Sequence, residues 1–149
     1  MGTAVAPERD RLAIRAANED VRTASEWLER TCAERDVPPD QTFRLDLCLN
    51  EALANIISHG GPSALAAPIG LALAVAEDAG GAHARLSLSD SGQAFDPVHQ
   101  ITAPRAPTLA DAEPGGLGLT MIRGYCDQLS HERRDGTNHL TIVVRWVRS

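Results

Sequence analysis

Two polar side chains interrupt an otherwise apolar helical pattern in the segment LCLNEALANIISHG, which covers residues 47–60. Glu51 and Asn55 are four residues apart, so a helix places them as neighbours on one face, beside its apolar stripe. A carboxylate there could take a proton from an attacking hydroxyl, and a carboxamide oxygen could bind Mg²⁺. The simpler interpretation is a solvated helix edge on which the two side chains are hydrogen-bonded to each other, and this segment alone favours it.

A third polar residue, Asp90, follows Leu86 and Leu88 in an alternating strand pattern. The pleat of a strand would point its carboxylate toward the core side of the sheet, where it needs a hydrogen-bond donor. Gly92 follows two residues later and would allow a tight turn or the close approach of a ligand. The pattern is equally consistent with a strand-end aspartate in an Asx-turn.

The segment EPGGLGLT contains Gly115, Gly116 and Gly118 at the start of a helical pattern. Backbone N–H groups exposed there would lie where the helix dipole favours an anion, so this segment could bind phosphate groups. It differs from the dinucleotide-binding fingerprint, because no clear strand precedes it and Met121 occupies the place of the third glycine. Taken alone, the glycines are also consistent with a flexible hinge.

Together, these segments favour a site for an adenine nucleotide and Mg²⁺. They would supply a general base, an oxygen ligand for the metal, an acceptor at the pocket floor and an amide-rich loop for phosphates. The proline-rich segment 97–115 lies between the last two, and such long loops are often functional lids or disordered. All 14 basic residues are arginine, which excludes the lysine-containing Walker A loop.

The elements that must position these residues follow from periodicity and from helix signals. Asn18 is predicted to cap a helix that ends near Glu34, and Asp40 a second helix that ends at Gly60. Strands are predicted over 11–16, 69–75, 82–90 and 139–146, and a further helix over 117–129. Short turns between consecutive strands, including a hairpin turn at RRDGTN, imply a largely antiparallel sheet. We therefore expect an α+β fold, a two-layer α/β sandwich with the helices on one face of the sheet.

Composition limits the class of protein. The chain has 149 residues, of which 43% are hydrophobic, so a single domain with a substantial core is expected over 9–149, after a flexible tail at 1–8. The net charge of −6 gives no electrostatic reason to expect nucleic acid or an anionic membrane as a partner. No apolar run reaches the length of a membrane span, and the N-terminus has no signal-peptide pattern, so a cytoplasmic protein is expected.

There are three cysteines, Cys32, Cys48 and Cys126, and no CxxC motif. The first two fall on apolar positions of predicted helices. We expect small buried thiols in a reducing compartment, with a catalytic thiol as the less favoured alternative.

Three segments of the chain resemble the sequence boxes of one superfamily. NEALANIISHG resembles the N-box of the GHKL (Bergerat-fold) ATPases, SDSGQAFDP resembles their G1 box, and GGLGLTMIRGYCDQL resembles their G2 box. With the ending GTNHLTIVVRW, the chain is most similar to bacterial anti-sigma factor serine kinases of partner-switching systems. The resemblance covers about 12–146 and implies a Bergerat fold with a mostly antiparallel, mixed sheet.

The resemblance also implies roles for individual residues. Glu51 matches the catalytic base and Asn55 the Mg²⁺ ligand. Asp90 matches the aspartate that accepts from the adenine amino group, and Gly92 the glycine packed beside the base. The positions that match the phosphate-binding loop and its neighbours are Gly116, Leu117, Gly118, Leu119 and Thr120.

By the same resemblance, the chain is an ATP-dependent protein serine/threonine kinase that acts as an anti-sigma factor. Its substrate would be a STAS-type anti-anti-sigma protein, which competes with a sigma factor for the kinase, and the kinase would form a homodimer. The main alternative is a nucleotide-gated binding module that sequesters a regulatory partner without phosphoryl transfer. The least favoured alternative is a scaffold with an empty pocket.

Overall fold

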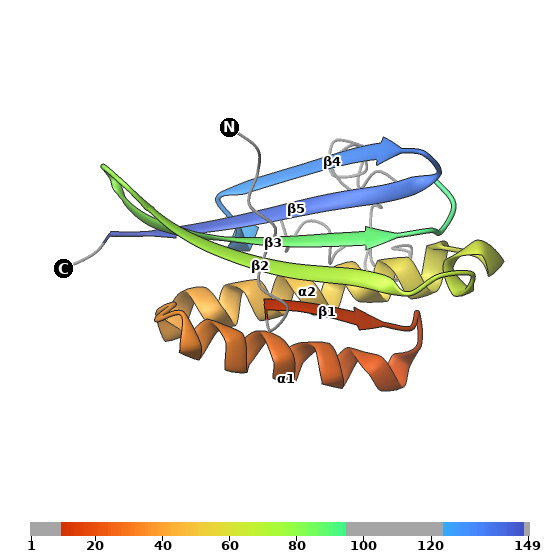
Figure 1. Cartoon of the computed structure of the whole chain (residues 1–149), viewed down its shortest axis with the longest axis horizontal. Coiled ribbons are helices and arrows are strands. Elements are labelled where there is room, and N and C mark those ends of the chain that lie inside the picture. Colours follow the sequence, from red (N-terminus) through yellow and green to blue (C-terminus); the bar gives the residue numbers. More distant parts are fainter. Residues whose placement is uncertain (1–9, 95–123, 148–149) are drawn as a thin grey trace, which may run out of the picture.

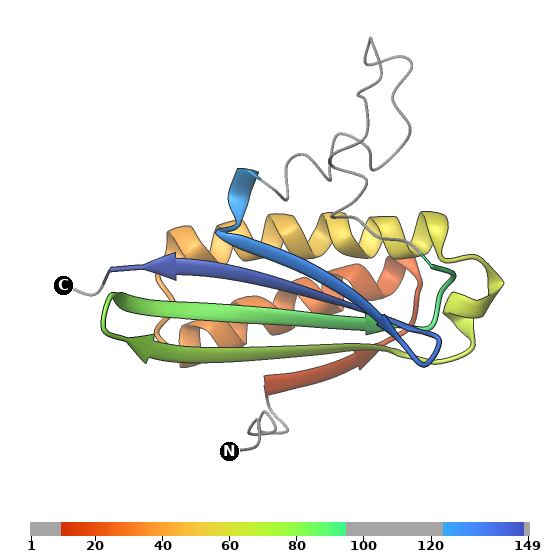
Figure 2. The same cartoon turned by 90° about the horizontal axis from the view of Figure 1, so that it is seen from above.

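The computed structural model describes residues 10–94 and 124–147. In chain order the elements are β1 (Arg11–Ile14), α1 (Asn18–Glu34), α2 (Pro39–His59), the 3-10 helix η2 (Pro62–Leu65), β2 (Ile69–Asp78), β3 (Gly81–Asp90), β4 (Gln128–Arg134) and β5 (Thr137–Trp146). The five strands form one sheet in the order β1-β2-β3-β5-β4, and every described pairing is antiparallel. α1 and α2 lie side by side against one face of this sheet (Figures 1 and 2). The predicted α+β two-layer sandwich is confirmed.

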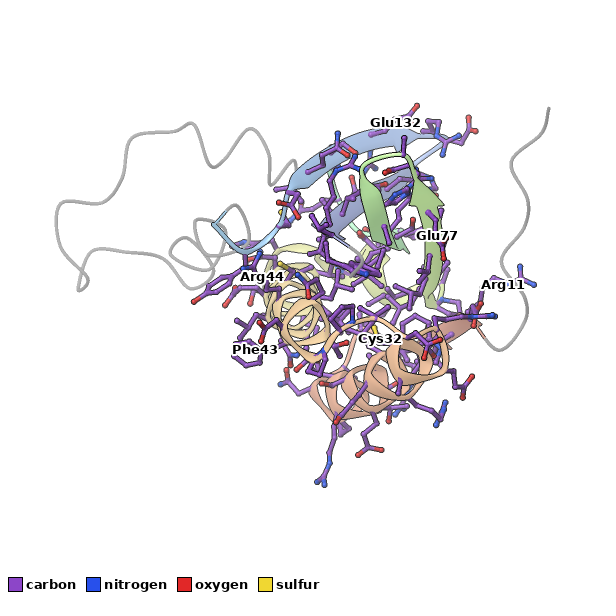
Figure 3. All side chains as sticks on the ribbon, turned by 90° about the vertical axis from the view of Figure 1, so that its left-hand side faces the viewer. Arg11, Cys32, Phe43, Arg44, Glu77 and Glu132 are labelled. Carbon is purple, nitrogen blue, oxygen red and sulfur yellow. The ribbon has the colours of Figure 1, made fainter. Side chains whose placement is uncertain are left out.

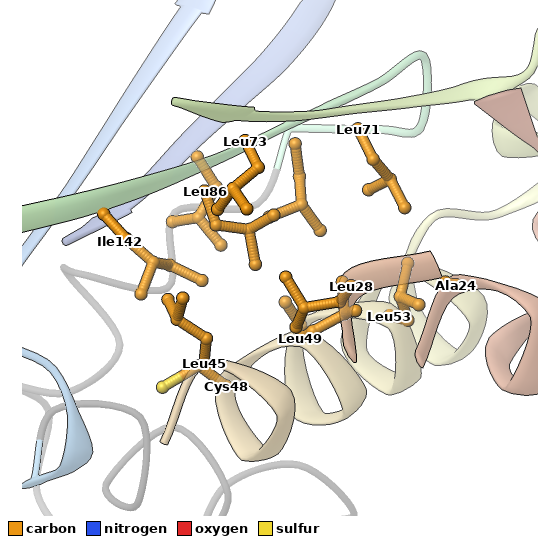
Figure 4. Packing of buried hydrophobic residues seen from close by; sticks show 14 of the residues in the cluster. Ala24, Leu28, Leu45, Cys48, Leu49, Leu53, Leu71, Leu73, Leu86 and Ile142 are labelled. Carbon is orange, nitrogen blue, oxygen red and sulfur yellow. The ribbon is translucent and has the colours of Figure 1, made fainter. Parts of the chain in front are cut away.

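The core forms where the apolar stripes of the helices meet the inward-facing side chains of the strands. Leu45, Leu49 and Leu53 recur every four residues along α2 and are almost fully buried. Opposite them lie Leu73, Leu86 and Ile142 from three neighbouring strands, as Figure 4 shows. β3 and the first half of β2 alternate between buried and more exposed residues, as a sheet with one covered face requires.

Both helices are surface helices of a sandwich. α2 is 21 residues long, but its buried residues occupy only one face. No helix within 10–94 and 124–147 is long and apolar enough to cross a membrane.

The two predicted helix caps are wrong. The cap position of α1 is Ala17, and Asn18 is the first helical residue. The helix entry is instead fixed by Asp20, which accepts from the backbone N–H of Arg15 at 2.8 Å and from its guanidinium at 3.0 Å. For α2 the cap position is Pro38, whose carbonyl accepts the first helical hydrogen bond. Asp40 lies in the first turn, where the helix dipole favours a negative charge.

The predicted helix over 117–129 extends too far. The helical turn at the start of the second described range ends at residue 125, and β4 begins at Gln128. Leu129 pairs with Ile142 of β5 and faces the core, a position that helical and strand spacing predict equally well. Asp135 and Gly136 have φ of 52° and 77°, which suits a tight hairpin turn joining two strands.

The cysteines have the environments that the sequence predicts. None of the three cysteines forms a disulfide, and Cys32 and Cys48 are fully buried. Cys32 points into the space between α1 and the sheet, whereas Phe43 points away from the molecule and is 61% exposed (Figure 3). Cys126 packs against the edge of the core, where its side chain contacts Cys48.

Burial of Cys32 makes the stability of the fold depend on alkaline pH. Burial raises the pKa of the Cys32 thiol from an ordinary value of 9.0 to about 11. The unfolded chain therefore loses this proton first, so the contribution of the neutral thiol is complete below pH 9.0 and is lost as the pH rises toward 11. We expect the free energy of unfolding, from urea titrations, to fall over this range more steeply for the wild type than for Cys32→Ala. Parallel pH profiles would contradict this assignment.

Candidate functional site

α2 carries two predicted site residues whose polar atoms are buried without partners. Asn55 is only 3% exposed, and neither its amide nitrogen nor its oxygen has a hydrogen-bond partner in the described part of the chain. Glu51 is half-buried, and its Oε2 atom is equally unpartnered among those residues. The alternative of a Glu51–Asn55 hydrogen bond on a solvated edge is therefore wrong. Leaving such a group without a partner costs about 1–3 kcal/mol, so these atoms favour a partner from outside the described residues.

Helical geometry explains why these two residues differ in burial. Asn55 follows Cys48 and Ala52 at intervals of four and three residues, and all three are buried. Asn55 therefore extends the apolar stripe rather than flanking it. Glu51 lies at the border of that stripe, so the residue is only half-buried although one of its carboxylate oxygens is buried.

Asp90 ends β3 and lies where the pleat predicts. It is 8% exposed and belongs to the same buried row as Leu86 and Leu88. Its Oδ1 accepts the backbone N–H of Gly92 at 2.9 Å, so the Asx-turn is present as well. The two interpretations describe one arrangement, in which the turn holds a carboxylate that faces the helix layer.

The turn after β3 is docked on the C-terminal end of α2. The N–H of Gln93 donates to the carbonyl of Gly60 at 2.9 Å, and its side-chain Nε2 donates to the carbonyl of His59 at 2.6 Å. A Cβ atom on Gly92 would lie 2.9 Å from the Cα of Gly60 and 2.8 Å from Oδ1 of Asp90. Gly92 is therefore required by the close approach of two backbones, and this contact brings Asp90 to the helix end that carries Asn55.

Replacement of Gly92 by alanine is expected to destabilise the fold by about 1–3 kcal/mol, because the turn must move away from α2. The same movement would displace Asp90 and weaken nucleotide binding. Urea denaturation and calorimetric titration with ATP measure the two effects. Gly124→Ala is the matched control, since an added Cβ there meets no atom of the described residues within 4 Å. Equal stability and affinity of the two variants would contradict the packing argument.

The predicted phosphate-binding residues lie outside the described residues; they are Gly116, Leu117, Gly118, Leu119 and Thr120. Two described residues on either side of them in sequence contact α2. Gln93 is held at the C-terminal end of α2, and Cys126 contacts Cys48 eleven residues before His59, about 17 Å along the helix. Glu51 and Asn55 lie between these two points of α2.

Sequence reasoning missed two residues that support Asp90. Arg133 and Asn138 come from the hairpin of β4 and β5, and both donate hydrogen bonds to the turn after β3. Asn138 is 48 residues away from Asp90 in sequence, so no local pattern could relate them. The hairpin turn RRDGTN was the one available signal, since it sets which residues of the two strands pair.

The described residues could supply one or two ligands of a metal ion, but not a complete set. The described residues contain no group of three or more His, Cys, Asp and Glu side chains that could hold a metal ion. Mg²⁺ usually keeps several waters and takes one or two protein oxygens together with phosphate oxygens. The buried, unpartnered amide of Asn55 fits that kind of site, and it would gain the partner that it lacks.

Comparison with known proteins identifies the family. A family model of the histidine kinase-like ATPase domain matches residues 14–144. This match includes nearly all of the described residues and also residues 95–123. The chain belongs to this family. As a histidine kinase-like ATPase domain it binds ATP.

A relative with a named activity indicates which type of reaction this family member catalyses. The serine/threonine-protein kinase BtrW of Bordetella bronchiseptica is 38% identical over 117 residues, which are 78% of this chain and 80% of BtrW. This histidine kinase-like ATPase domain is therefore of the serine/threonine protein kinase type, in agreement with the family resemblance noted from the sequence.

Solved structures share the fold. The RsbU and RsbW domains of Rv1364c from Mycobacterium tuberculosis match 93% of this chain with a TM-score of 0.66 at 19% identity, and the match covers 32% of that longer chain. A chain of the SiaB–SiaC complex from Pseudomonas aeruginosa matches 90% of this chain with a TM-score of 0.62 at 14% identity, over 88% of its own length. The present chain spans about a third of the Rv1364c chain, and at these identities the likeness concerns the fold.

Proposed function

We propose that the protein is an ATP-dependent serine/threonine kinase that acts as an anti-sigma factor in a cytoplasmic partner-switching system. Its substrate is a STAS-type anti-anti-sigma protein. The observation that carries this proposal is the pair of unpartnered polar groups on α2, Glu51 and Asn55, beside the docked turn of Asp90. The chain is 38% identical to a serine/threonine-protein kinase over 80% of that relative's length, which supports phosphoryl transfer to a serine or threonine as the reaction.

The site residues other than Glu51 form the nucleotide site. The carboxylate of Asp90 accepts from the adenine amino group, and Gly92 lies beside the base. Gly116 and Gly118 bind the phosphates. Leu117, Leu119 and Thr120 adjoin those glycines. The Asn55 oxygen would hold Mg²⁺, which would supply positive charge to neutralise the phosphates.

Glu51 acts as the general base. The hydroxyl oxygen of the substrate serine or threonine attacks the γ-phosphorus, the bond to the β-phosphate oxygen breaks, and ADP leaves. The hydroxyl proton passes to the Glu51 carboxylate. Its half-buried position suits this role, because a protein substrate must reach the carboxylate from outside while its buried oxygen stays clear of competing hydrogen bonds within the described residues.

The kinase has two partners in this proposal. The unphosphorylated STAS protein and a sigma factor compete for it, and phosphorylation releases the STAS protein so that the sigma factor is sequestered. The kinase works as a homodimer. Transcription is then controlled by the phosphorylation state of the substrate.

The test uses the purified full chain, Mg-ATP labelled at the γ-phosphate, and STAS proteins encoded in the same genome. We expect label on one serine or threonine of one of them, and none when that residue is replaced by alanine. A stable stoichiometric complex with no transfer over hours would contradict the kinase proposal and favour the nucleotide-gated binding module.

A further inference from the structure

Two residues of the β4–β5 hairpin converge on the turn that holds Asp90. Asp135 and Gly136 form the tight turn, and the register that follows pairs Arg133 with Asn138. On its other side, β5 pairs Asn138 with Asp90 of β3. The hairpin therefore places an arginine and an asparagine beside the carboxylate at the end of β3.

Asn138 is 5% exposed, and its amide nitrogen faces three acceptors of this turn. The Nδ2 atom lies 3.2 Å from Oδ1 of Asp90, 3.4 Å from the carbonyl oxygen of Gly92 and 3.0 Å from that of Gln93. An amide has two N–H groups, so they are shared among the three acceptors. This one side chain therefore holds both the carboxylate and the backbone that follows it.

Arg133 determines which way the Asn138 amide points. Its Nη1 atom donates to Oδ1 of Asn138 at 2.9 Å and to the carbonyl of Gly92 at 3.1 Å. Since a guanidinium is only a donor, the amide oxygen must face Arg133 and the amide nitrogen must face Asp90. Nη2 also reaches the carbonyl of Gly136 at 3.5 Å, which anchors the guanidinium to the hairpin.

These hydrogen bonds fix the orientation of the Asp90 carboxylate. Its Oδ1 receives the N–H of Gly92 and the amide of Asn138, and no described residue donates to its Oδ2. Rotation of the carboxylate would break both bonds. Oδ2 is therefore held as an acceptor for a ligand, and an acceptor attracts an amino group and repels a carbonyl oxygen.

We infer that Arg133 and Asn138 are positioning residues that make the site select a purine presenting an amino group, as in adenine, over one presenting a carbonyl, as in guanine. Neither residue needs to touch the nucleotide, because both act by holding Asp90. The inference rests on the proposed binding of adenine at Asp90. It does not depend on phosphoryl transfer.

The test is calorimetric titration of the full chain with Mg-ATP and Mg-GTP, using Asn138→Leu, which keeps the volume and removes the donors. We expect the preference for ATP over GTP, the ratio of the two Kd values, to fall about tenfold. Asn138→Ser restores one hydroxyl donor and is expected to recover part of the ratio. Asn50→Leu is the matched control, because the Asn50 amide bonds to Asp46 in its own helix, and its ratio should equal that of the wild type.

The inference would be overturned if Asn138→Leu kept the wild-type ratio of the two Kd values, or if it weakened the binding of ATP and GTP equally. Asn138 would then have only a structural role. Arg133→Met covers the case in which Asn138→Leu fails to fold, since it keeps the aliphatic part of the side chain and is expected to lower the same ratio. A wild type without preference for ATP would also overturn it. Because the readout is binding, selective binding without transfer would reject the kinase proposal and retain this one.

Discussion

Replacement of Glu51 by glutamine is expected to slow phosphate transfer to the protein substrate by about 100- to 10,000-fold, the usual contribution of a general base. Glutamine has the same size and can occupy the same place on α2, but its amide cannot take the hydroxyl proton. ATP affinity should change little, because Glu51 is not among the residues proposed to bind the nucleotide. Single-turnover transfer and calorimetric titration with Mg-ATP measure the two quantities separately.

The matched control for this variant is Glu26→Gln. Glu26 is exposed on α1, and its one partner among the described residues is Arg22 of the same helix, an interaction of little energetic value. Transfer by this control should equal that of the wild type. Undiminished transfer by Glu51→Gln would reject the assigned base, and a loss of ATP affinity equal to the loss of rate would assign Glu51 to binding instead.

Replacement of Asn55 by leucine is expected to have two opposite effects. Without nucleotide, the variant should be more stable by about 1–3 kcal/mol, because a buried amide without partners is exchanged for an apolar side chain of similar volume. At the same time, the Mg²⁺-dependent part of ATP binding should be lost, since the metal loses its protein ligand. Urea denaturation without ligand, and titration with ATP in the presence and absence of Mg²⁺, test both effects.

Asn50→Leu again provides the comparison, because its amide is satisfied within α2. Its Nδ2 atom donates to the Asp46 carbonyl at 2.7 Å and to Oδ1 of Asp46 at 3.2 Å. This variant should be no more stable than the wild type and should bind Mg-ATP normally. If Asn55→Leu were destabilised like an ordinary polar-to-apolar change, Asn55 would not be an unsatisfied ligand group.

Much of the site could be predicted because its residues belong to periodic elements. The alternation in β3 correctly points Asp90 toward the helix layer. The helical spacing in α2 correctly makes Glu51 and Asn55 neighbours, but it does not predict that Asn55 lies within the buried stripe instead of beside it. The predictions that failed concern helix starts, where several neighbouring residues compete for the capping position. Asn18 and Asp40 are good capping residues, but the chain enters α1 through Arg15 and Asp20, and a proline starts α2. These choices differ by small free energies that sequence pattern does not resolve.

The rest of the site depends on contacts between distant parts of the chain. Gly60 and Gly92 are 32 positions apart, and they fit together because residue 92 has no side chain: a Cβ atom there would lie 2.9 Å from the Cα of Gly60. Arg133 contacts Gly92 across 41 positions, and that contact exists only once the hairpin register is known. Periodicity describes how one element faces the core, but not which residues of two elements meet.

The strand order has a consequence for how the protein is made. β5 is the last described strand to be synthesised, yet it lies inside the sheet between β3 and β4. Until β5 leaves the ribosome, β3 has an open edge and Asp90 lacks the amide of Asn138. The nascent chain therefore cannot complete its sheet, and it exposes an unpaired edge that neighbouring nascent chains could add to. Rapid release of the finished chain, or protection of that edge by a chaperone, would limit aggregation during synthesis.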